Sequence, residues 1–167
     1  MAKAWKTKGV SPSDPFRDAA KTIVATKYAE LLSHVPGALG DPDDETIHDM
    51  RISAKRLREV LNLLRDGLSK KRVKPARDAV DQLNDALGEV RDCDVFLQWV
   101  DDTSGQDLAD QERAALDAIR EMVEIERDNE LDSLRAAMED LLEETLPEAL
   151  SKLVGRARVD EVIRRHG

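Results

Sequence analysis

The stretch IHDMRISAKRLREVLNLL, residues 47–64, combines an apolar face and a line of cations on one expected helix. At about 100° per residue, Met50 and the leucines fall on one side and predict a core face. Most basic side chains gather beside this face, at its border, and Arg56 falls on the other flank. We call the border residues the cationic row: His48, Arg51, Lys55, Arg58 and, just past the stretch, Arg65. Their position predicts a cleft or rim of a helical bundle.

The rest of the chain favours long helices. Aromatic residues make up 3% of the 167 residues and charged residues 37%, a composition that sheets do not favour. Apolar residues recur with a helical period in four segments, at about 14–35, 43–68, 74–100 and 107–145. Short loops make successive helices antiparallel. We therefore expect an all-α fold: an antiparallel four-helix bundle of long amphipathic helices, with a short C-terminal helix.

Proline and glycine divide the chain further. Asp14 and Pro15 suit an N-cap and a first helical residue. The breaker-rich PGALGDPDD (36–44) and the basic SKKRVKP (69–75) predict loops, and Pro147 ends the fourth helix. We expect a flexible N-terminal tail over 1–13, a bundle over 14–146 and a C-terminal helical tail over 147–167.

Charge is segregated along the chain. The net charge is -9, yet residues 51–77 contain ten basic and two acidic residues, whereas residues 101–150 contain 17 acidic and four basic ones. Such asymmetry indicates partners and not fold. A general nucleic-acid binder is usually basic overall, and few aromatics are present for base stacking. The pattern predicts a local cationic site in a protein that otherwise repels anions.

The cationic row is long for a single phosphate. With a rise of about 1.5 Å per residue, it spans about 25 Å from His48 to Arg65. Arginine offers a planar fork and lysine a point charge to phosphate oxygens, so an extended polyanion fits the row. A solvated helix face is the alternative, but such faces carry acidic residues four positions away, and Arg51 and Arg58 have none.

A second stretch, LGEVRDCDVFLQWV (87–100), continues the core period on the third expected helix. Gly88 in mid-helix costs about 1 kcal/mol relative to alanine, which is tolerable where another helix approaches closely. Arg91 can add a cation to the site, and Asp92 can orient a neighbouring cation. An ordinary surface ion pair is the alternative.

Together the two stretches resemble the CHAD family, the conserved histidine α-helical domain. Its first motif, His-x-x-Arg-x-x-x-(Lys/Arg)-Arg-x-Arg, is matched by His48, Arg51, Lys55, Arg56 and Arg58. Its second motif, Leu-Gly-x-x-Arg-Asp-x-Asp-Val, is matched by Leu87, Gly88, Arg91, Asp92, Asp94 and Val95. The resemblance covers about residues 15–146. The order and spacing of both motifs make it specific.

The resemblance implies a helical bundle that binds inorganic polyphosphate in a basic cavity, without catalysis, and associates with polyphosphate granules. It implies binding roles for the five residues of the first motif and a weaker one for Arg91, with Asp92 and Asp94 supporting. Arg65 extends the row. Members usually carry two such repeats in one chain, and this chain carries one. We therefore expect a homodimer whose twofold axis replaces the internal one.

Other functions stay open at this stage. His48 could be the phosphoacceptor of a histidine phosphotransfer bundle, although the cations at 55, 56 and 58 have no task in that chemistry. RNA or another polyanion could occupy the same row. We expect no enzyme, cofactor or metal site. The single cysteine, Cys93, and the lack of a signal peptide or membrane span predict a cytoplasmic protein.

Overall fold

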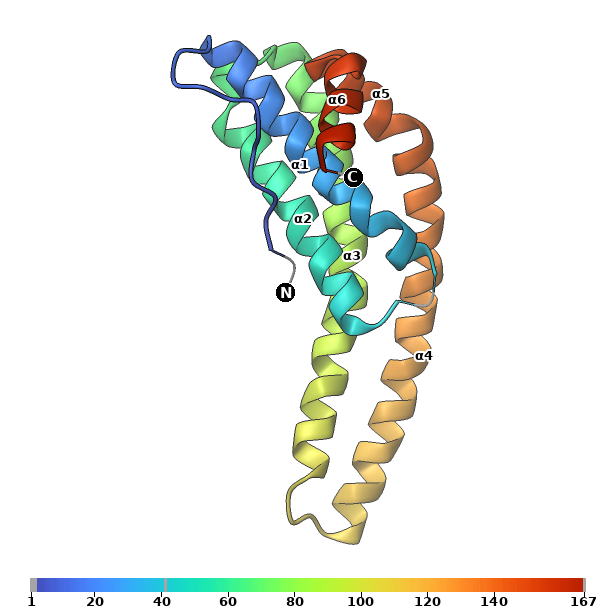
Figure 1. Cartoon of the computed structure of the whole chain (residues 1–167). Helices are drawn as coiled ribbons and strands as arrows, with labels where there is room; N and C mark the ends of the chain where they lie inside the picture. The colour runs from blue at the N-terminus through green and yellow to red at the C-terminus, as the bar shows by residue number, and fades with distance from the viewer. Residues whose placement is uncertain (1–2, 41, 167) are drawn as a thin grey trace.

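The computed structural model describes residues 3–40 and 42–166, which form helices joined by short loops (Figure 1). The six α-helices are α1 (Phe16–Leu39), α2 (Asp44–Leu63), α3 (Lys70–Ser104), α4 (Asp110–Asp140), α5 (Leu146–Val154) and α6 (Arg156–His166). A 3₁₀ turn, η1 (Arg65–Gly67), follows α2, and a π-helical turn, η2 (Leu141–Thr145), joins α4 to α5. The predicted all-α fold is confirmed.

The helices pack as an antiparallel bundle around one core. Helix α2 lies between α1 and α3, and α4 runs along α3. Helices α5 and α6 return over α1, and α5 also packs on α3. The last part of α3 and the first part of α4 extend beyond the other helices as a hairpin, seen at the bottom of Figure 1. One end of the molecule is therefore a bundle and the other a two-helix projection.

The C-terminal segment forms two helices where the sequence predicted one. Gly155 separates them with a φ of +92°, a left-handed conformation that glycine adopts without strain. Leu150 and Val162 are 0% and 2% exposed and belong to the same core as the first three helices. The division of the chain at residue 147 stays a prediction, but residues on both sides of it share this core.

Several predicted helix ends are wrong. Helix α1 continues through Pro36, in the segment expected to be a loop, and α3 begins at Lys70 instead of near residue 74. Pro75 removes one backbone hydrogen bond from α3, but buried Val73 and Ala76 pack this first part into the core. Asp14 does not cap α1, because its carboxylate accepts a hydrogen bond from the Ser11 N–H at 2.8 Å.

Helix α2 ends at Leu63, five residues before the predicted end. The turn η1 presses against the start of α1: a Cβ atom on Gly67 would lie 2.8 Å from the Phe16 ring. A residue with a side chain at position 67 would therefore clash, and glycine permits the close approach. At its other end α2 begins as predicted, because the Asp43 carboxylate accepts a hydrogen bond from the Thr46 N–H at 2.8 Å.

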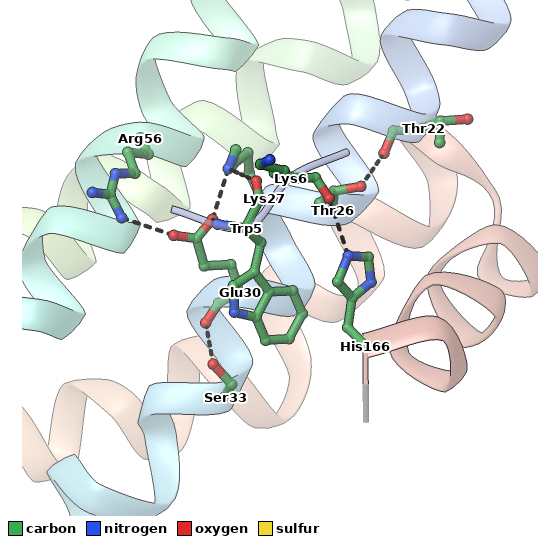
Figure 2. Close-up of polar contacts among 9 residues, drawn as sticks. All are labelled: Trp5, Lys6, Thr22, Thr26, Lys27, Glu30, Ser33, Arg56 and His166. Carbon is green, nitrogen blue, oxygen red and sulfur yellow. Dashed lines mark hydrogen bonds and ion pairs between the residues drawn. The ribbon is translucent and has the colours of Figure 1, made fainter. Parts of the chain in front are cut away.

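The N-terminal segment lies against the bundle and is joined to it by a buried carboxylate. Glu30 of α1, whose side chain is 1% exposed, accepts hydrogen bonds at 2.8 Å from Lys27 and from Arg56 of α2 (Figure 2). The Trp5 N–H donates to the same carboxylate at 3.3 Å, and the Trp5 ring stacks on His166 at 4.7 Å between centroids. Both ends of the described chain thus meet over α1. The expected flexibility of residues 1–13 stays a prediction.

Candidate functional site

The cationic row lies along α2 and ends in the turn η1. His48 and Arg51 are half-buried, whereas Lys55, Arg58 and Arg65 are exposed. The same helix buries Met50, Leu57 and Leu61 in the core, so the row borders the core face as the helical period predicts. Its exposed members occur towards the α3 end of α2.

Arg51 lies over the second motif. A Cβ atom added at Gly88 of α3 would be 4.0 Å from the Nε atom of Arg51, an ordinary contact distance, so the arginine lies beside this glycine. Within residues 3–40 and 42–166, this buried Nε has no hydrogen-bond partner. A buried polar group without a partner is uncommon in folded proteins. Arg51 therefore has an unused donor.

Arg58 and Lys55 differ in their surroundings. The Nε atom of Arg58 is 2.6 Å from a carboxylate oxygen of Asp81 on α3, and Arg77 lies 4.0 Å from the other oxygen. Lys55 is exposed and makes no ion pair with any described residue. The sequence could not predict the pair of Arg58 with Asp81, because helical periodicity relates only residues of the same helix. The row is therefore neutralised in part at Arg58.

Arg56 points away from the row. Its Nη1 atom donates to buried Glu30 at 2.8 Å, as Figure 2 shows, and its side chain is 27% exposed. Arg56 and Lys27 thus share the buried Glu30 carboxylate, each at 2.8 Å. The structure thus places this motif residue in the α1–α2 contact. Its predicted binding role stays a prediction that this placement does not favour.

Arg91 lies beside the His48 end of the row. Its side chain is 18% exposed, and Nη1 is 3.7 Å from a carboxylate oxygen of Asp44, one helical turn before His48. The same atom is 3.9 Å from Asp94 and makes no hydrogen bond within the described part of the chain. Arg91 therefore adds a cation between α2 and α3, with two carboxylates nearby at ion-pair distance.

The two aspartates of the second motif occupy different environments. The Asp94 side chain is 2% exposed and accepts a 2.6 Å hydrogen bond from Nε of Arg127 on α4. Arg127 also donates from Nη2 to the Pro42 carbonyl at 3.1 Å, in the loop before α2. Asp94 thus supports the fold. Asp92 is exposed and lines a groove between α3 and α4, so it does not lie with the cations.

Three residues of the site could not be predicted from the sequence: Asp81, Glu30 and Arg127. Each is the partner of a motif residue, and each lies on a neighbouring helix. In the described ranges, no group of three or more histidine, cysteine, aspartate or glutamate side chains is arranged to hold a metal ion. None of the helices within those ranges has the length and apolar composition that a membrane span needs.

These observations define an all-α domain with a row of cations where its second helix meets its third. The family model for the CHAD domain matches residues 22–166, nearly the whole chain. The chain belongs to the CHAD domain family. No curated protein and no solved structure matches the chain.

We expect Asp94→Ala to lower the free energy of unfolding by about 3–5 kcal/mol, because Arg127 would remain largely buried without its carboxylate. Urea unfolding followed by circular dichroism measures this change. Asp92→Ala is the matched control: it removes the same group two residues away, at an exposed position, and should change stability little. Equal losses in both variants would contradict the role assigned to Asp94.

Proposed function

We propose that the protein binds inorganic polyphosphate through the cationic row, without catalysing a reaction on it. Membership of a family linked to polyphosphate binding supports the identity of the anion. The observation that carries the site is the row itself: Arg51 has a buried donor without a partner among the described residues, and Lys55 lies one turn further along the same helix. Association with polyphosphate granules belongs to the same proposal.

The chemistry of the row suits a linear chain of phosphates. Successive phosphates each present charged oxygens, and guanidinium and ammonium groups donate strong charge-assisted hydrogen bonds to them. From His48 to Arg58 the helix rises about 15 Å, so several phosphates can be contacted in series. Arg58 joins by exchanging Asp81 for a phosphate, and Arg91 reinforces the positive potential near His48.

The first test is calorimetric titration with long-chain polyphosphate, comparing the wild type with Arg51→Ala/Arg58→Ala. Loss of two charge-assisted contacts should weaken binding at least about tenfold, and the salt dependence of binding should decrease. Arg156→Ala/Arg164→Ala is the matched control, since it removes the same charge from exposed positions on α6. If the control loses as much affinity, polyphosphate binds to the positive charges of the protein in general and not to the cationic row. If the wild type does not bind, the proposal fails.

RNA in the same calorimeter tests the other polyanion. We expect polyphosphate to displace RNA at matched phosphate concentration, because the row offers cations but no aromatic platform for bases. Equal competition would instead assign the row to phosphate backbones in general.

Asp81→Asn should have the opposite effect and strengthen polyphosphate binding. The substitution removes the carboxylate that pairs with Arg58 and keeps the size of the side chain. Since half-exposed ion pairs contribute about 0.2–1 kcal/mol, we expect affinity to rise by about 1.4- to fivefold. The same titration measures the change, with Asp85→Asn, an exposed residue on the same helix, as the control for charge alone. Unchanged or weaker binding in Asp81→Asn would show that Arg58 does not contact the anion.

We further propose that two copies of the chain complete one site as a homodimer. Two cationic rows repel each other, so a polyanion between them would stabilise the pair. We expect light scattering with a short polyphosphate to give twice the 18.7 kDa mass of the chain. The Arg51→Ala/Arg58→Ala variant should stay monomeric. A monomer mass at the concentration where calorimetry shows tight binding would contradict the dimer and leave the binding proposal intact.

A further inference from the structure

The hairpin of α3 and α4 carries a second surface that the cationic row does not use. A groove of about 470 Å³ runs between the two helices, and we call it the acidic groove. It is lined by Glu89, Asp92, Cys93, Phe96, Met122, Val123, Glu126 and Glu130. Its lining residues belong to α3 and α4, the two helices that project beyond the bundle (Figure 1).

The floor of the acidic groove is apolar and open to solvent. Phe96 is 43% and Met122 70% exposed, and Phe96 stacks on Trp99, which is itself 50% exposed. Val95 and Ile125 add further exposed apolar area on the same two helices. Single exposed apolar residues are ordinary, but a contiguous group with a polar rim marks an interaction site.

The rim of the acidic groove is negative on both sides. Glu89 and Asp92 come from α3, and Glu126 and Glu130 from α4. Among the described residues, no cation lines the groove, and the nearby Arg127 is paired with Asp94. The Cys93 thiol in the wall responds to this environment: burial, and then the charges of Glu126 and Glu130, raise its pKa above the usual range.

We propose that the acidic groove binds a cationic amphipathic helix of a partner protein. Such a helix would place apolar side chains on Phe96 and Met122 and basic side chains against the four carboxylates. The lining spans two helical turns on each side, about 10–12 Å, which matches two to three turns of a docked helix. Methionine and aromatic side chains adapt readily to apolar side chains of different shape.

Charge argues against a second copy of this chain as the occupant. If the same faces met across a twofold axis, four carboxylates would approach four carboxylates, and like charges oppose association. The cationic row of another copy has the right sign, but most large apolar residues of α2 pack against its own core, and Leu63 alone among them is strongly exposed. That helix can therefore place only one exposed apolar side chain on the floor. A separate basic helix satisfies both the charge and the apolar requirement.

The test uses the whole protein, without polyphosphate, and a designed 18-residue peptide. The peptide has leucines at helical spacing on one face and lysines on the other, and a second peptide replaces every lysine with glutamate. Cys93 is the single cysteine and lines the groove, so its alkylation by N-ethylmaleimide reports occupancy. At about ten times the Kd of the lysine peptide, alkylation should slow about tenfold. The glutamate peptide should give no protection.

Two matched variants distinguish the groove from general attraction to an acidic protein. Glu89→Gln/Glu126→Gln removes two rim charges, and Glu139→Gln/Glu144→Gln removes two from exposed positions elsewhere on the α4 and η2 surface. Only the first should weaken peptide binding about tenfold or more. Met122→Ala, which keeps the charge, should weaken it as well. Equal losses in both charge variants, or an unprotected Cys93, would overturn the proposal.

Self-association is examined by gel filtration of the same variants. If the free protein is dimeric and Met122→Ala makes it monomeric, a second copy covers the groove and the partner-helix proposal fails. The Arg51→Ala/Arg58→Ala variant should bind the lysine peptide as the wild type does. The acidic groove is thus tested independently of polyphosphate binding.

Discussion

The arrangement of the site depends on one buried carboxylate, that of Asp94. It holds Arg127 of α4, and Arg127 in turn donates to the Pro42 carbonyl just before α2 begins. Three segments that are distant in the sequence are therefore fixed to one another by two hydrogen bonds. A buried charge without its partner is strongly unfavourable, so Asp94 and Arg127 stay paired. This pair fixes the start of α2 relative to α3 and α4. The cationic row of α2 and the acidic groove of α3 and α4 are therefore held in one arrangement by the same buried carboxylate.

Much of this arrangement could be predicted from the sequence, because helical periodicity acts within a single helix. The period of α2 placed Met50 and Leu57 in the core and the cations at its border, and Asp43 marked the start of the helix. Gly88 faces α2, although the nearest atom to an added Cβ, the Nε of Arg51, would be at an ordinary contact distance of 4.0 Å. Features of this kind can be predicted from the sequence because each depends mainly on the residues of one helix.

What could not be predicted depends on the relative position of helices. The pairs of Arg58 with Asp81 and of Arg56 with Glu30 each join two helices, and one helical period contains no information about their mutual register. Several helix ends were predicted wrongly for a related reason. Pro36 and the segment from Lys70 to Pro75 look like breakers locally, yet the helices continue because tertiary packing outweighs propensity there.

The separation of charge along the molecule gives it a large electric dipole moment. The turn from α2 to α3, with Arg65 and the basic start of α3, lies at the bundle end. The turn from α3 to α4, where residues 101–110 include four acidic and no basic residues, lies at the opposite end (Figure 1). Near any densely anionic surface, the resulting torque turns the bundle end inward and the hairpin outward. The tip of the hairpin would then face solution, whatever the arrangement of the anion.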